Sequence, residues 1–225
     1  LEELSYIIAH NLRGPAGNIG LLTDALMAHA NAEESSGSVG GVFTLAEGLA
    51  YIKESSDNLM NSLTSLMQIV EIKLNKTMSA DECNLQELIR DVTKQLQSTI
   101  FESHANIVTS LEVETILYPK IYLESILYNF ISNALKYRKN DVAPEIVITT
   151  STQGGKVQLS VKDNGLGIDL DRYGDKLFKL SQVFHAGKDS KGFGLYLTKT
   201  QIESLGGSIS VTSKPDAGSE FVVTF

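Results

Sequence analysis

The sequence has little cysteine, because Cys83 is the only one among its 225 residues. A single thiol cannot form a disulfide within the chain, and no second Cys or His lies near it at the spacing of metal ligands. We therefore expect Cys83 to behave as a small buried hydrophobic residue and the protein to work in a reducing compartment, the cytoplasm.

Long apolar runs and an excess of positive charge are also absent. No stretch approaches the roughly 18 to 20 apolar residues that a membrane helix needs, and the start has no signal-peptide pattern. Because residue 1 falls inside a helical pattern, we expect an upstream sensor or linker in the parent protein, which would provide any membrane attachment. The formal net charge of −8 argues against nucleic acid as a partner, although a local basic pocket for a mononucleotide stays possible.

Residues 1–78 predict a pair of long helices. Apolar residues recur at steps of three and four from Leu4 to Leu26, and at heptad spacing from Leu45 to Val70. A polar, Gly/Ser-rich segment, residues 31–41, separates the two patterns. The resulting helical hairpin predicts a homodimer in which two hairpins form a four-helix bundle, with packing of the hairpin on its own chain as the alternative.

Residues 79–225 have a mixed rhythm that predicts a second domain, an α+β sandwich. We expect helices at residues 84–103, 119–137 and 194–205. We expect strands at residues 107–111, 115–118, 145–150, 157–163, 208–213 and 221–225. Strict alternation at Val157, Leu159 and Val161 predicts one buried face for the strand that these residues occupy.

His10 lies on the polar side of the first predicted helix, about 200° from the centre of its apolar stripe. An exposed surface histidine is the ordinary interpretation. Pro15, five residues further on, would kink the helix near His10 by removing a hydrogen bond to the Asn11 carbonyl. Such a costly feature suggests that the local shape matters.

Asp163 lies two residues after Val161 and is therefore expected to point to the same, buried face of the strand. Burying a carboxylate there costs free energy unless hydrogen-bond donors surround it. Gly165 and Gly167 follow in the segment DNGLGI, where a backbone without side chains could let a flat ligand approach. A tight turn capped by Asp or Asn is the competing interpretation.

Asn129, Asn133 and Lys136 share one face of the predicted helix at residues 119–137, opposite an apolar face with Leu123, Leu127, Phe130 and Ala134. Amide oxygens and a cation suit hydrated Mg²⁺ and a polyphosphate, although two Asn on a solvated face would be ordinary. In KGFGLYLTK, the first residues precede a helix whose N–H groups could bind phosphate, which is weak evidence by itself.

Taken in order, these segments resemble the motifs of the sensor histidine kinase family over essentially the whole chain. AHNLRGP resembles the H-box, LYNFISNALKY the N-box and DNGLGI the first glycine box. LFKLSQVF, with Phe178 and Phe184, resembles the F-box, and KGFGLYL the second glycine box. The order of the motifs is the specific feature.

The resemblance implies that residues 79–225 bind ATP with Mg²⁺ in the fold shared with gyrase, the heat-shock chaperone of about 90 kDa and mismatch-repair ATPases. Asp163 would receive the adenine amino group, and Asn133, beside Asn129, would bind Mg²⁺. Residues 168–191 would form the ATP lid. The remaining nucleotide-binding residues by resemblance are Lys136, Tyr137, Gly165, Gly167, Lys191, Gly192, Gly194 and Leu195.

The implied activity is autophosphorylation of His10, with Asn11 and Lys136 as the other catalytic residues, followed by transfer to the aspartate of a response-regulator receiver domain. Family members usually carry Glu or Asp after the histidine, and Asn11 cannot accept a proton as a carboxylate does. Gly14 stands where many relatives have Thr or Asn, so we expect little loss of label from a phosphorylated regulator. Two alternatives stay open: a degenerate dimeric scaffold that binds nucleotide, and an ATPase of the same fold.

Overall fold

The computed structural model describes residues 14, 16–26, 45–74, 79–179 and 194–225. Contacts divide the chain into two compact units, Leu1–Val70 and Glu71–Phe225. The domain boundary that the sequence predicts between residues 78 and 79 adjoins residues 75–78, which lie outside the described residues, and it stays a prediction.

The first unit is helical in all of its described residues. Residue 14 and residues 16–26 are helical, and α2 (Leu45–Leu74) continues without a break for 30 residues. A Cβ on Gly48 would lie 2.6 Å from Cδ2 of Leu26, so the two helical segments pack closely at this point. Much of the α2 stripe is exposed, with Leu49 at 54% and Leu63 at 41%. In the described part of the chain, no helix is apolar and long enough to span a bilayer.

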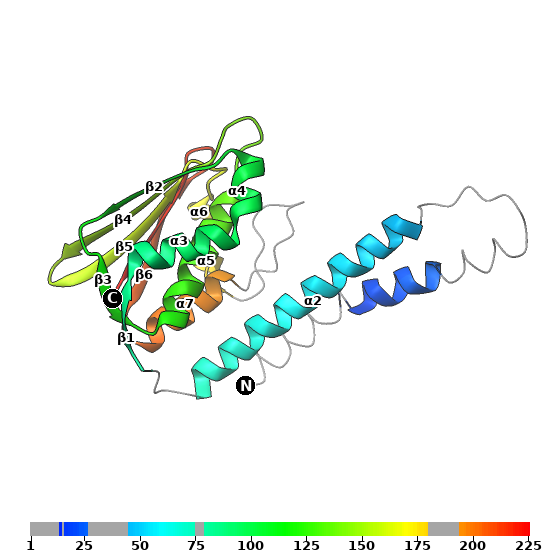
Figure 1. Cartoon of the computed structure of the whole chain (residues 1–225), viewed down its shortest axis with the longest axis horizontal. Helices are drawn as coiled ribbons and strands as arrows, with labels where there is room; N and C mark the ends of the chain where they lie inside the picture. The colour runs from blue at the N-terminus through cyan, green and yellow to red at the C-terminus, as the bar shows by residue number, and fades with distance from the viewer. Residues whose placement is uncertain (1–13, 15, 27–44, 75–78, 180–193) are drawn as a thin grey trace, which may run out of the picture. The chain divides into compact units, whose positions relative to one another are not determined.

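The second unit contains seven strands and five α-helices among its described residues (Figure 1). Its elements in chain order are β1 (Asp81–Asn84), α3 (Leu85–Gln95), α4 (Gln97–Ser103), β2 (Asn106–Leu111), β3 (Thr115–Tyr118), α5 (Lys120–Lys136), β4 (Glu145–Gln153), β5 (Lys156–Asp163), α6 (Leu170–Tyr173), the 3-10 turn η1 (Gly174–Lys176), α7 (Gly194–Ser204), β6 (Ser208–Lys214) and β7 (Gly218–Thr224). The predicted strands and the helices predicted at residues 119–137 and 194–205 are therefore present, with ends that differ by a few residues.

The main sheet has five strands in the order β2-β4-β5-β7-β6. Only β2 and β4 run parallel, and the other neighbours are antiparallel, as expected for hairpins. A second, two-stranded sheet pairs β1 with β3. Helices α3, α5 and α7 lie on one side of the main sheet (Figure 1), which gives the two-layer α+β sandwich that the sequence predicts.

The core lies between α5 and the sheet. Phe130 of α5 stacks on Phe221 of β7 with ring centroids 5.1 Å apart. The predicted apolar face of α5 is at most 5% exposed at each of its residues, Leu123, Leu127, Phe130 and Ala134. Burying a side chain of this size contributes roughly 1.5–3 kcal/mol, so this face anchors α5 and thereby fixes the polar face that carries Asn129 and Asn133.

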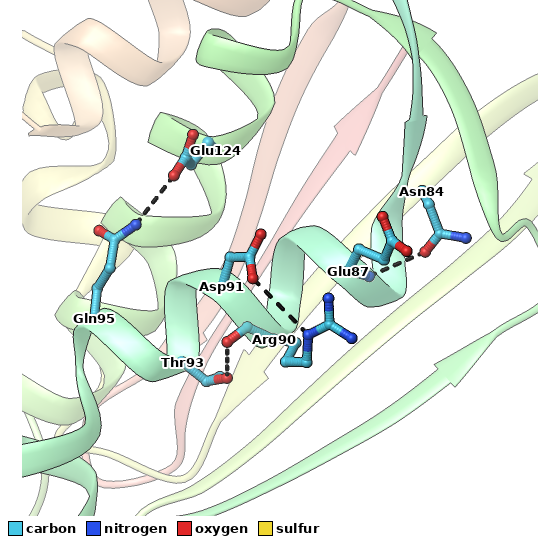
Figure 2. A network of polar contacts seen from close by, with 7 residues as sticks. All are labelled: Asn84, Glu87, Arg90, Asp91, Thr93, Gln95 and Glu124. Carbon is cyan, nitrogen blue, oxygen red and sulfur yellow. Dashed lines mark hydrogen bonds and ion pairs between the residues drawn. The ribbon is translucent and has the colours of Figure 1, made fainter.

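The helix predicted at residues 84–103 is in fact two helices, α3 and α4, with the break at Leu96. No glycine or proline marks this break in the sequence. Asn84 is the N-cap of α3, and its Oδ1 accepts a hydrogen bond of 3.0 Å from the Glu87 amide (Figure 2). The strand β1, which ends at this cap, was not expected from the sequence.

Figure 2 also shows how α3 joins α5. The Gln95 side-chain amide donates to Oε1 of Glu124 over 3.0 Å. The neighbouring ion pair of Arg90 and Asp91 spans 3.9 Å between exposed side chains and adds little stability. Apolar packing of Leu88 and Val92, each at most 3% exposed, therefore holds α3 in place.

Candidate nucleotide site

Asp163 ends β5 with its carboxylate half-buried. Its Oδ1 accepts two backbone hydrogen bonds, from Gly165 over 2.8 Å and from Ser219 over 3.3 Å. No hydrogen bond to Oδ2 occurs within the described residues. Burial raises the pKa of the Asp163 carboxyl above its ordinary value of 3.8, and the two N–H donors offset part of that rise. The carboxylate thus offers one further acceptor oxygen at the C-terminal end of β5, the central strand of the sheet.

The loop after Asp163 has no room for side chains at two positions. A Cβ on Gly165 would lie 2.6 Å from the Tyr137 carbonyl oxygen and 2.8 Å from Oδ1 of Asp163. Gly167 has φ of +66°, and a Cβ there would overlap the Lys214 carbonyl. Both glycines are therefore required by the shape of the loop. Close packing within the chain therefore accounts for the two glycines of DNGLGI, and the approach of a flat ligand stays a prediction.

The β6–β7 hairpin holds this loop from the other side. The Asp216 amide donates to the Leu166 carbonyl over 2.7 Å, and the Ile168 amide donates to Oγ of Ser213 over 2.7 Å. Ser213 is 9% exposed and donates in turn to the Gly218 carbonyl. A cavity of about 260 Å³ opens beside the loop, lined by Leu166, Gly167, Ile168, Asp169, Tyr173, Pro215 and Asp216. Sequence reasoning missed Ser213, since nothing in SISVTSK distinguishes it from the other serines.

Asn129 and Asn133 are brought together on α5, as predicted. Nδ2 of Asn133 donates to Oδ1 of Asn129 over 3.2 Å. Nδ2 of Asn129 donates to Oγ1 of Thr198 on α7 over 2.7 Å. A Cβ on Gly194 would overlap Oδ1 of Asn129, so a side chain at the first residue of α7 would displace the Asn129 amide. Thr198 is a second residue that the sequence gave no signal for.

Lys136 and Tyr137 lie at the C-terminal end of α5, one turn beyond Asn133. Nζ of Lys136 lies 5.8 Å from the centroid of the Tyr137 ring. The Tyr137 carbonyl accepts the Leu166 amide over 2.9 Å, so this end of α5 is tied to the glycine loop. The two predicted binding segments, the N-box helix and the loop after Asp163, therefore form one site.

The other predicted site residues divide into two groups. Leu195 is half-buried in the first turn of α7, and Phe178 lies with its ring centroid 5.6 Å from Nζ of Lys199. His10, Asn11, Lys191 and Gly192 lie outside the described residues, as do Pro15 and Phe184. Their predicted roles stay predictions.

The described part of this site fits an adenine nucleotide. Oδ2 of Asp163 can accept from an exocyclic amino group, and the cavity of about 260 Å³ lies beside the loop that follows Asp163. The first N–H groups of α7 have no partner within the helix and favour an anion. Among the residues that the structure describes, no cluster of three or more His, Cys, Asp or Glu could hold a metal. A Mg²⁺ ion here would therefore bind amide and phosphate oxygens.

Comparison with known proteins identifies the class. Residues 119–225, from the N-cap of α5 to the C-terminus, match the family model "Histidine kinase-, DNA gyrase B-, and HSP90-like ATPase". This range contains every described residue of the candidate site. Fold and site thus define an ATP-binding domain of this class.

Similar proteins narrow the class. The chain is 35% identical over 155 residues to sensor protein BceS of Bacillus subtilis. The alignment covers 68% of this chain and 45% of BceS. The structure of Acinetobacter baumannii histidine kinase AdeS shares the fold, with 18% identity, a TM-score of 0.73 and 96% of each chain covered. Histidine kinase ThkA, solved in complex with response regulator protein TrrA, also shares the fold, with 22% identity, a TM-score of 0.72, and coverage of 99% of this chain and 60% of ThkA.

The chain belongs to the sensor histidine kinase family. It spans less than half of the length of BceS. Its membership of this family confirms the expectation that was drawn from the order of the sequence motifs.

Proposed function

We propose that this chain is the catalytic core of a sensor histidine kinase, which phosphorylates its own His10 with ATP and Mg²⁺ and then transfers the phosphoryl group to an aspartate of a response regulator. The observation that carries the proposal is Asp163. Its Oδ1 accepts hydrogen bonds from two backbone amides, Oδ2 has no hydrogen bond within the described residues, and the loop that follows has glycine at residues 165 and 167. This arrangement suits recognition of an adenine amino group better than it suits stability.

Bound ATP, with Mg²⁺, would supply the γ-phosphoryl group and leave as ADP. Asn133 would offer an amide oxygen to the metal ion, and Lys136 would neutralise developing negative charge on the phosphates. His10 would provide the attacking ring nitrogen, which must be unprotonated to attack. ATP is available in the cytoplasm, which is consistent with the predicted location of this core.

Asn11 is expected to limit the rate of the proposed reaction. When a ring nitrogen of His10 becomes phosphorylated, the proton on the imidazole must leave, and an amide oxygen can orient the ring but cannot take up that proton. Water would have to accept it. We therefore propose a kinase whose autophosphorylation is slow.

Two partners belong to the proposal. A response regulator is supported by the complex of the similar kinase ThkA with TrrA. A second copy of this chain is supported by the exposed stripe of α2, on which Leu49 and Leu63 retain 54% and 41% of their surface in a single chain. A dimeric four-helix bundle would bury that stripe.

The test is a labelling experiment. The chain is incubated with Mg²⁺ and γ-labelled ATP beside two variants, His10→Ala and the matched control His29→Ala. We expect acid-labile, base-stable label on the wild type and the control, and none on His10→Ala. No label on the wild type despite measurable ATP binding would contradict the proposal and favour a nucleotide-binding scaffold, with Asn11 as the first suspect.

A further inference from the structure

Thr198 connects α7 to the proposed metal ligands on α5. It is 1% exposed, and its Oγ1 accepts a 2.7 Å hydrogen bond from Nδ2 of Asn129. A hydroxyl this deeply buried makes a contact that water cannot replace easily. The bond joins residues 69 positions apart, so it exists only because α5 and α7 pack together.

This bond determines which way the amide of Asn129 faces. With Nδ2 directed at Thr198, Oδ1 of Asn129 faces Asn133 and accepts its Nδ2 over 3.2 Å. The amide of Asn133 is thereby oriented as well. Since Oδ1 and Nδ2 lie on opposite sides of the amide carbon, the oxygen of Asn133 points away from Asn129, and it has no hydrogen bond within the described residues.

A hydroxyl can donate as well as accept, so Thr198 alone would allow the reverse order, with Nδ2 of Asn133 turned outward. The position of Gly194 opposes that order. Oδ1 of Asn129 lies so close to Gly194 that a Cβ there would overlap it. Gly194 begins α7, a helix of 11 residues, and the partial positive charge at a helix N-terminus favours an amide oxygen over an NH₂ group.

We propose that Thr198 is a positioning residue for magnesium. It orients Asn129, which orients Asn133 so that the oxygen of Asn133, rather than its NH₂ group, faces the ion bound to the nucleotide. An NH₂ group in that place would repel the cation. This inference rests on the proposed function, because it concerns how the same site binds Mg²⁺ with ATP.

The test compares hydroxyl-free variants by calorimetric titration of the full chain with a non-hydrolysable ATP analogue, once with Mg²⁺ and once with EDTA. We expect the wild type to bind more tightly with Mg²⁺. Thr198→Val keeps the shape but removes the acceptor, and it should lose about tenfold in affinity with Mg²⁺ and little with EDTA, as for a lost hydrogen bond to a ligand-orienting group. Thr198→Ser should restore the Mg²⁺ effect.

The matched control is Thr200→Val on the same helix. Thr200 is half-buried and donates to the Tyr196 carbonyl over 2.9 Å within its own helix, so both affinities should stay as in the wild type. Thr198→Ala provides a second hydroxyl-free variant if thermal unfolding shows that the valine variant is not folded. A purely structural role would lower both affinities together, and it would not separate Mg²⁺ from EDTA.

Each outcome has one meaning. Equal loss with and without Mg²⁺, or no loss in Thr198→Val and Thr198→Ala, would overturn the positioning role while nucleotide binding stands. Equal affinity of the wild type in Mg²⁺ and EDTA would overturn the metal role of Asn133 and this inference with it. Absence of any nucleotide binding by the folded wild type would overturn the proposed function itself.

Discussion

The role proposed for Asp163 opposes the stability of the fold. Its half-buried carboxylate has a raised pKa, so the ionised form costs folding free energy at neutral pH. Asparagine has the same shape, and its Oδ1 can still accept from Gly165 and Ser219. However, it would place a donor where Oδ2 now offers an acceptor.

We expect Asp163→Asn to weaken nucleotide binding at least about tenfold while raising the melting temperature of the nucleotide-free chain. Because the pKa of Asp163 is raised on folding, the unfolded chain loses its proton first, and stability falls as the pH rises from 3.8 to the higher folded value. The advantage of the variant should therefore grow above about pH 4 and then level off. Thermal unfolding between pH 4 and 8, with calorimetry, measures both effects, and a lower melting temperature at pH 7 would contradict the argument.

Asn11 permits a gain-of-function prediction. Asn11→Asp would place a proton acceptor next to His10, and we expect initial autophosphorylation to rise about tenfold or more, within the range of general base catalysis. Quench-flow or timed labelling with γ-labelled ATP measures the rate, with Asn11→Ala as the control that gains no base. An unchanged or slower rate in Asn11→Asp would show that the proton leaves by another route.

The turn between β4 and β5 and the loop after Asp163 both depend on a glycine with positive φ, for different reasons. Gly154 has φ of +59° in the two-residue turn between β4 and β5, and a Cβ there would meet open space. Gly167 has φ of +66° in the loop after Asp163, and a Cβ there would overlap the Lys214 carbonyl of β6. The first position needs only the backbone conformation, whereas the second also needs the close approach of the β6–β7 hairpin.

We expect Gly154→Ala to lower the free energy of unfolding by about 1–2 kcal/mol, the cost of the left-handed conformation. Gly167→Ala should cost about 2 kcal/mol more, as overpacking does, and should also weaken nucleotide binding. Urea denaturation and calorimetry of the two variants measure this pair. Similar stability losses in both would mean that the loop and the hairpin can separate without cost.

At the scale of the whole molecule, the exposed stripe of α2 predicts self-association. We expect the chain to be a dimer and Leu63→Glu to make it monomeric, because a carboxylate in a bundle core would lose its hydration. Ala50→Glu adds the same charge at an exposed position that faces away from the stripe, and it should stay dimeric. Sedimentation equilibrium at micromolar concentration distinguishes these states. A monomeric wild type, or a dimeric Leu63→Glu variant, would contradict the bundle.

Much of the second domain could be predicted because its signals are local. The alternation that ends at Val161 predicts the side of the strand to which Asp163 points. The apolar stripe on α5 predicts that Asn129 and Asn133 lie together on another face of this helix. The strand β1 could not be predicted, since its segment DECN has no strand pattern and becomes a strand by pairing Cys83 with Ile116 of β3. The break at Leu96 likewise has no marker in the sequence.

The sequence by itself determined the order of the motifs, the apolar faces and the glycines of the loop after Asp163, because each depends on neighbours within a few positions along the chain. Only the tertiary structure decided that Ser213 accepts a hydrogen bond from the loop after Asp163 and that Thr198 accepts one from Asn129. These contacts join residues 45 and 69 positions apart. Their geometry is set by packing between elements, which no local pattern of side chains records.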